Sequence, residues 1–153
     1  MPAFDANLAL CDGSAVWSFA NLNTSDYGTP VSTTRNAGGF AILDLKESAA
    51  KGLSVVLICT QTYTQSGGAG DDALTVIIEE SGSATFASDI HELGKFDIAA
   101  ATKGVILGSE TPATVVMKIA MKERYLRIDA SCTAADNFGV VYCYLTPYPF
   151  RVL

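Results

Sequence analysis

The chain has 153 residues, of which 49% are hydrophobic and 17% charged, so it can bury one substantial core and its composition argues against disorder. Its formal net charge is −6, and its 10 Lys and Arg residues are scattered without a run that could follow a phosphate backbone, so we expect no direct nucleic-acid partner. The longest apolar run, around residues 55–59, is far shorter than the roughly 18 residues that span a bilayer, which argues against a membrane partner.

In chain order, residues 1–39 lack the pattern of a strand and are predicted to be an irregular arm or loop region. Residues 7–19 and, further on, residues 44–52 have the only helical character in the sequence. Residues 21–39 are rich in Asn, Thr, Ser and Gly. This composition favours a long surface loop, or an arm that becomes ordered only against a neighbour.

From residue 40 onward, segments rich in β-branched and aromatic residues alternate with clusters of Gly, Ser, Asn and Asp, which is the pattern of strands and turns. The predicted fold is a single all-β domain over residues 1–153, an antiparallel β-sandwich or jelly roll of about eight strands. Residues 147–153 form a proline-broken aromatic tail. The predicted strands are residues 40–46, 53–63, 73–80, 84–90, 96–101, 113–120, 124–132 and 138–146.

The segment 124–132 has the clearest alternation of apolar and polar residues. A period of two places the two sets on opposite faces of a strand, one in the core and one in solvent or against a partner. Residues 133–137 have the composition of a turn, so we expect this strand and residues 138–146 to pair as a hairpin. The expected core set is Leu126, Ile128, Ala130 and Cys132, and the other set is Arg127, Asp129 and Ser131.

Four cysteines, at positions 11, 59, 132 and 143, have spacings that match neither a CxxC pair nor a zinc signature. Cys59, Cys132 and Cys143 lie in predicted strands, where a free thiol packs as a small apolar side chain. We therefore expect these three cysteines to belong to the core, and we expect no metal or cofactor at any of the four.

Residues 67–74 read Gly-Gly-Ala-Gly-Asp-Asp-Ala-Leu and match the spacing of a calcium-binding nonapeptide repeat, with Asp71 and Asp72 as weak candidate ligands. That motif forms its calcium sites between stacked repeats, and this sequence holds one copy. One copy does not supply the about six to eight oxygen ligands that calcium takes. A glycine-rich hairpin loop between the strands 53–63 and 73–80 accounts for the same residues, so we predict no metal site.

His91 is the only histidine, so a metalloenzyme or a nucleophilic triad would depend on it alone. No Gly-x-Ser-x-Gly elbow is present in the sequence. Glu79 and Glu80 point to opposite faces of one predicted strand and do not converge as an acid–base pair, so we interpret them as solvated surface groups. The sequence therefore predicts no catalytic residue and a protein that is not an enzyme.

Five aromatic residues lie toward the two ends of the chain, outside the clear strands. Trp and Tyr often dominate the energetics of protein interfaces. These residues are therefore candidates for a protein interface, or else they cap the ends of the sandwich. They are Trp17, Phe19, Tyr27, Tyr148 and Phe150.

Residues 123–129 and 139–146, which read Glu-Arg-Tyr-Leu-Arg-Ile-Asp and Gly-Val-Val-Tyr-Cys-Tyr-Leu-Thr, resemble tailed-bacteriophage capsid cement proteins. These are also called decoration proteins, here of the jelly-roll type found in short-tailed phages. The polar stretch before residue 53 and the segments 53–57 and 73–80 fit the same layout. The resemblance implies a homodimer or homotrimer that is made in the host bacterial cytoplasm. On the outer surface of an expanded capsid it would bridge and stabilise subunits of the major capsid protein.

A second class of function stays open on the same residues. It is a jelly-roll module that binds a carbohydrate or a receptor, assisted by calcium at Asp71 and Asp72. Such a module would need an exposed aromatic platform on one face and would lose its ligand when calcium is chelated. A cement protein would be indifferent to sugars and metals.

Overall fold

Strands account for all the regular elements in the part of the chain that the structure describes. The structure, a computed structural model, describes residues 8–18, 26–27, 40–46, 52–59, 74–98, 113–132 and 137–147. The strands are β1 (Ala9–Ser18), β2 (Asp26–Tyr27), β3 (Leu43–Asp44), β4 (Leu53–Cys59), β5 (Leu74–Ser81), β6 (His91–Ile98), β7 (Ala113–Ile119), β8 (Tyr125–Cys132) and β9 (Asn137–Pro147).

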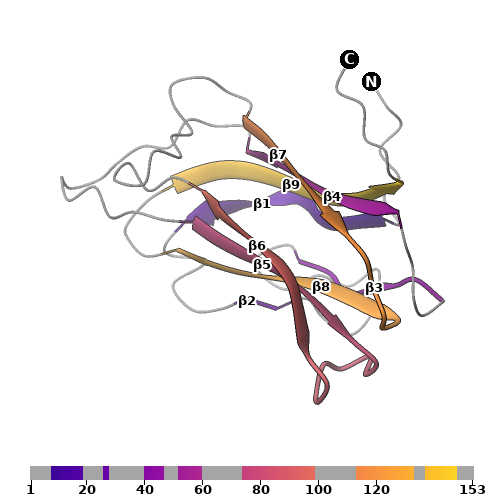
Figure 1. Ribbon diagram of the computed structural model, residues 1–153. Coiled ribbons are helices and arrows are strands. Elements are labelled where there is room, and N and C mark those ends of the chain that lie inside the picture. The colour runs from indigo at the N-terminus through magenta and orange to yellow at the C-terminus, as the bar shows by residue number, and fades with distance from the viewer. Residues whose placement is uncertain are drawn as a thin grey trace.

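The strands form two antiparallel sheets that lie face to face (Figure 1). One sheet, here called the β9 sheet, has the strand order β1-β9-β4-β7. The other, the β8 sheet, has the order β2-β8-β5-β6, and β3 also pairs with β8. This arrangement confirms the predicted all-β antiparallel β-sandwich, in which β4, β5, β7, β8 and β9 correspond to predicted strands.

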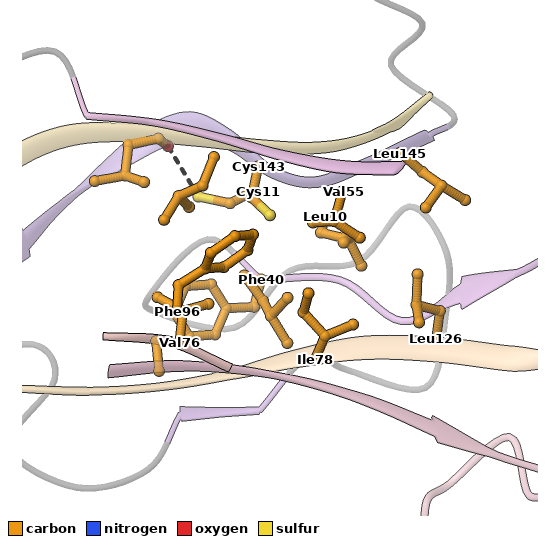
Figure 2. Packing of buried hydrophobic residues seen from close by; sticks show 14 of the residues in the cluster. Leu10, Cys11, Phe40, Val55, Val76, Ile78, Phe96, Leu126, Cys143 and Leu145 are labelled. Atoms are coloured by element: carbon orange, nitrogen blue, oxygen red, sulfur yellow. Dashed lines mark hydrogen bonds between the residues drawn. The ribbon is translucent and has the colours of Figure 1, made fainter. Parts of the chain in front are cut away.

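The core lies between the two sheets because each strand buries alternate residues. In β5, Leu74, Val76 and Ile78 are buried and the residues between them are half-buried. Side chains alternate between the two faces of a strand, so this period of two turns one apolar row inward. Rows from both sheets meet in one cluster (Figure 2). Its members include Leu10, Phe40, Val55, Leu57, Leu126, Ile128, Val141 and Leu145.

The connection between β5 and β6 corrects one predicted strand. We expected a strand over residues 84–90, but residues 82–90 form turns and bends, and β6 begins at His91. β6 takes in the first residues of the strand expected over 96–101. The cause is the backbone conformation of Phe86 and Asp89, whose φ values of 50° and 53° lie in the left-handed region, outside the range of a regular strand.

Residues 7–19, which we expected to have helical character, contain strand β1 instead. β1 pairs with β9 from Ala9 opposite Tyr144 to Ser18 opposite Asn137. Gly13 has a φ of 74°, which a right-handed helix excludes. Pairing with β9 supplies backbone hydrogen bonds that a helix would otherwise have to provide.

The segment 40–46 forms less strand than expected, since β3 covers only Leu43–Asp44. Phe40 makes an isolated bridge to Cys11, and the N–H of Ala41 donates to the carbonyl oxygen of Leu10 at 2.9 Å. The segment therefore joins the β1 edge of one sheet to the other sheet. Helical character expected over residues 44–52 is absent from their described part, where Lys46 has a φ of 65°. Residues 47–51 lie outside the described residues.

Two expected hairpins are wrong. β8 and β9 follow one another in the chain but belong to different sheets, and the same is true of β4 and β5. β8 pairs with β2, β3 and β5, whereas β9 pairs with β1 and β4. The alternation of a strand indicates which of its faces is buried but not which strand lies beside it. A short connection that crosses between sheets therefore has the same sequence pattern as a hairpin.

Candidate binding face

The outer surface of the β9 sheet carries aromatic and aliphatic side chains. In β9, Val141, Cys143 and Leu145 are buried in the core, while Tyr142 and Tyr144 alternate with them and are half-buried. The two tyrosines therefore lie on the outer face of the sheet. Cross-strand partners share a face, so this outer face also includes residues of β4 and β7. We call the set Val56, Ile58, Val116, Tyr142 and Tyr144 the aromatic face.

Val56 lies at the centre of the aromatic face. It is opposite Tyr144 of β9 on one side and opposite Val116 of β7 on the other. Val56 is fully buried although it points away from the core, and cross-strand neighbours on one face lie about 5 Å apart. Tyr144 is partly buried on this face, and this burial raises the pKa of its hydroxyl. Val116, in contrast, remains 38% exposed. The face is thus a packed apolar layer with an exposed margin on β7.

Tyr142 is positioned by the backbone of the edge strand β1. Its ring lies so close to Gly13 that a Cβ atom at that position would overlap it. Gly13 also has a positive φ, which a residue with a side chain rarely adopts. Glycine at position 13 therefore leaves room for the tyrosine ring beside β1.

Charged side chains lie at the margins of this face in the described strands. Lys118 of β7 is opposite Ser54, and Asp12 of β1 is opposite Tyr142. The central positions of the aromatic face carry no charge. Ser54 is buried, and its side-chain hydroxyl has no hydrogen-bond partner among the described residues. Apolar centres with polar margins are typical of protein-binding surfaces.

The outer face of the β8 sheet has a different character. Arg127 Nε donates to Glu79 Oε2 at 2.7 Å, and both side chains are largely buried. The guanidinium carbon of Arg127 lies 4.2 Å from the ring centroid of Phe86. Leu126, Ile128 and Ala130 of β8 are buried as predicted, and the side chain of Cys132 lies outside the description. Arg127 and Asp129 are buried too, which corrects the expectation that they face solvent or a partner. Phe86 from the β5–β6 loop covers Arg127.

Hydrogen bonds within the β5–β6 loop hold it in this position. Ser81 Oγ donates to the carbonyl oxygen of Ser88 at 2.9 Å and accepts from the N–H of Ser83 at 2.9 Å. The N–H of Phe86 donates to the carbonyl oxygen of Ser83 at 3.0 Å. These bonds close a compact loop from which the buried ring of Phe86 points at Arg127.

Glu80 is a buried structural carboxylate. It is 2% exposed, and its Oε2 accepts the backbone N–H groups of Lys122 and Glu123 at 2.7 and 3.0 Å. These two residues lie in the connection that carries the chain from β7 in one sheet to β8 in the other. Glu79 and Glu80 point to opposite faces as predicted. Their expected place on a solvated surface is wrong, because Glu80 is buried and Glu79 is largely buried in its ion pair with Arg127.

Trp17, one of the predicted interface residues, lies in the core. Its side chain is fully buried and packs edge-on against Phe40, with ring centroids 4.9 Å apart and planes at 69°. A fully buried indole is not available to a partner protein. The structure therefore corrects the interface assignment of Trp17, which β1 carries into the core.

Tyr27 lies in β2 opposite Asp129, and its side chain falls outside the description. Cys143 is a buried core residue, as expected, and Cys11 is buried in the core beside it. His91 is exposed at the start of β6. The other predicted site residues lie outside the described residues, and their roles stay predictions: Phe19, Asp71, Asp72, Tyr148 and Phe150.

Sequence reasoning missed the aromatic face although its signal was present. The stretch Val140–Thr146 places Val, Tyr, Tyr and Thr on one face and Val, Cys and Leu on the other. A strand with one face in the core and aromatic residues on the other face indicates a second apolar surface. Only the sheet order brings β4 and β7 beside it.

Comparisons with known proteins give no match to a family model, to a curated protein or to a solved structure. In the described part of the chain, no group of three or more His, Cys, Asp or Glu side chains could hold a metal ion. Those same residues include no helix long and apolar enough to cross a membrane.

Proposed function

We propose that this chain is a structural virion protein, a cement protein that binds the outer surface of an expanded tailed-phage capsid and stabilises the major capsid protein. The observation that carries the proposal is the contrast between the two outer faces of the sandwich. On the outer face of the β8 sheet, Arg127 is paired with Glu79 and packs under Phe86. The β9 sheet presents the aromatic face, which is suited to burial against another protein.

Strand pairing supports the jelly-roll form of the sandwich, which the resemblance implies. β1 pairs with β9, β2 and β3 with β8, β4 with β7, and β5 with β6. These pairs are nested like the two arms of one long hairpin that bends between β5 and β6. Successive pairs alternate between the two sheets. Wrapping such a ribbon into two sheets produces a jelly roll of about eight strands.

The proposed mechanism is thermodynamic linkage. A protein that binds the assembled shell but not free capsid subunits adds its binding free energy to the stability of the shell. A homodimer or homotrimer that binds several capsomers would gain avidity, because its second subunit meets a second capsomer at high effective concentration. The proposed location is therefore the outer capsid surface of a virion assembled in the bacterial cytoplasm.

A pair of matched variants tests whether the aromatic face is the binding surface. Val116 and Ile90 are the two large exposed hydrophobic residues of the described chain, at 38% and 43% exposure. Val116 lies on the aromatic face, and Ile90 is the last residue of the loop between β5 and β6 of the β8 sheet. Val116→Asp would place a charge in the apolar contact, so we expect the affinity for purified expanded shells to fall at least about tenfold.

Ile90→Asp is the control and should bind shells like the unchanged protein. Melting curves of both variants verify that each is folded, since both substitutions are at exposed positions. Equal binding by the two variants would show that the aromatic face is not the contact. No binding of the unchanged protein to any expanded shell of the phage that encodes it would contradict the cement function itself.

A carbohydrate-binding module is the second candidate, favoured by the positions of Tyr142 and Tyr144. The two residues are separated by one position on β9, so both rings lie on one face. Sugar rings stack on aromatic surfaces of this kind. This function would be favoured by a glycan that raises the melting temperature of the unchanged protein but not that of Tyr142→Ala. If a calcium chelator also removed the glycan's effect on the melting temperature, calcium at Asp71 and Asp72 would be implicated.

A further inference from the structure

Cys11 and Cys143 form a cross-strand pair in the core. They are direct partners in the antiparallel pairing of β1 and β9, and the register continues without a shift to Asp12 and Tyr142. Both side chains are buried, reduced and part of the same hydrophobic cluster. Figure 2 shows the two residues next to each other between the sheets.

The spacing of such partners is compatible with a disulfide. Directly opposite residues in an antiparallel pair have Cα atoms about 4.5–5.5 Å apart, and disulfides join Cα atoms about 4.4–6.8 Å apart. In the reduced state, Cys11 Sγ donates to the carbonyl oxygen of Val141 at 3.1 Å, the dashed line in Figure 2. A rotation about the Cα–Cβ bond of Cys11 exchanges this weak hydrogen bond for a bond to the sulfur of Cys143.

We propose that Cys11 and Cys143 form an intramolecular disulfide when the chain meets a small-molecule disulfide such as oxidised glutathione. One cysteine thiolate attacks the glutathione disulfide and releases one glutathione thiolate, which leaves a mixed disulfide on the protein. The second thiolate attacks the protein sulfur of that mixed disulfide and releases the second glutathione thiolate. The two cysteines lose two electrons and the oxidised glutathione gains them, while the two thiol protons end on the two reduced glutathione molecules.

The edge position of β1 provides the access that this chemistry needs. β1 is the outermost strand of the β9 sheet, and its register shifts at three places along the pairing with β9. Irregular edge strands open more readily than central strands. Opening of β1, together with the bridge from Phe40 to Cys11 and the hydrogen bond from Ala41 to Leu10, would expose both thiols. The bond would then attach this edge strand covalently to the neighbouring strand and close a loop from residue 11 to residue 143. This inference does not depend on the proposed function.

The test is oxidation during refolding, when both thiols are exposed. The protein is unfolded in urea with a reductant, refolded in a glutathione buffer rich in the oxidised form, alkylated and digested without reduction. Peptide mapping by mass spectrometry should find one linked peptide pair that contains Cys11 and Cys143. The oxidised protein should melt about 5–15 °C above the reduced protein, because the bond closes a long loop in the unfolded chain.

Two sets of variants separate this bond from other pairings. Cys59→Ser with Cys132→Ser retains the proposed pair and should still gain stability on oxidation, whereas Cys143→Ala should show no gain. Reduced thiols at positions 11 and 143 after refolding, or linked peptides that instead contain Cys59 or Cys132, would overturn the proposal. The map of the unchanged protein decides between these results even where a variant does not fold.

Discussion

At the scale of single residues, several polar side chains of this sandwich stabilise connections between its strands. Glu80 holds the β7–β8 connection, Arg127 and Glu79 form an ion pair under Phe86, and Asp44 binds Arg124 beside β3. Each of these groups makes hydrogen bonds within the chain. Burial without such bonds costs about 2–7 kcal/mol for a neutral polar group and more for a charged group.

Glu80→Ala should destabilise the protein strongly. It would remove the acceptor of two backbone N–H groups at a position that is 2% exposed, and we expect a loss of about 3 kcal/mol in the free energy of unfolding. Glu92→Ala, at an exposed position of β6, is the matched control and should change stability by less than about 0.5 kcal/mol. Urea denaturation measures both, and equal effects would contradict the role assigned to Glu80.

Asp44 should give the protein part of its sensitivity to acid. Arg124 donates to both carboxylate oxygens of Asp44 at 2.7 and 2.8 Å and Lys46 donates a third bond, which together hold the pKa of Asp44 well below its usual range. The stabilisation is therefore complete above the ordinary Asp pKa of about 4 and is lost as the pH falls below it.

The comparison of Asp44→Asn with the unchanged protein measures this contribution. We expect the variant to be less stable at neutral pH and its urea midpoint to depend less on pH between about 4 and 2. The effect should be small and should decrease with salt, because Arg124 is exposed. Parallel pH profiles for the two proteins would mean that the ion pair does not contribute.

At the scale of elements, the β5–β6 loop attaches to the β8 sheet through one aromatic ring. Phe86→Ala would remove the ring that packs against Arg127, and we expect a loss of about 2–4 kcal/mol together with faster proteolytic cleavage within residues 82–90. Ile90→Ala removes an exposed side chain from the same segment and should leave both properties unchanged. Unchanged cleavage in Phe86→Ala would show that the hydrogen bonds of the serines alone hold the loop.

The edge strand β1 offers a second comparison between matched variants. Gly13 and Gly52 have nearly equal φ values of 74° and 73°, but a Cβ at Gly13 would overlap the ring of Tyr142 while one at Gly52 would meet nothing within 4 Å. Gly52→Ala should therefore cost about 1–2 kcal/mol for its backbone alone. Gly13→Ala should cost more and should change the near-ultraviolet circular dichroism of Tyr142, and equal costs would contradict the proposed contact.

Some elements of this fold could be predicted from the sequence and others could not. The alternation of apolar and polar residues was sufficient to predict β5, β8 and β9 as strands, because a period of two among β-branched residues is typical of a strand that buries one face. Residues 84–90 have strand-like composition, and nothing local indicates that Phe86 and Asp89 adopt positive φ values. β1 looked partly helical because its partner, β9, lies more than a hundred residues away in the chain.

At the scale of the whole molecule, the sandwich was predictable and the candidate binding face was not. Composition and alternation predict two layers around one core, whereas the aromatic face exists only because the sheet order places β4 between β9 and β7. Trp17 illustrates the same limit, since an aromatic residue outside a clear strand pattern was assigned to an interface but packs against Phe40 in the core. Long-range pairing decides both cases, and local sequence does not encode it.

The central claim is that this chain belongs to the outer shell of a phage particle. The most direct measurement is the copy number of the protein in purified, DNA-filled particles of the phage whose genome encodes it, determined by quantitative mass spectrometry against the major capsid protein. Our account predicts a stoichiometry comparable to that of the capsid subunit. Absence from the particles, or only a few copies in each, would contradict it.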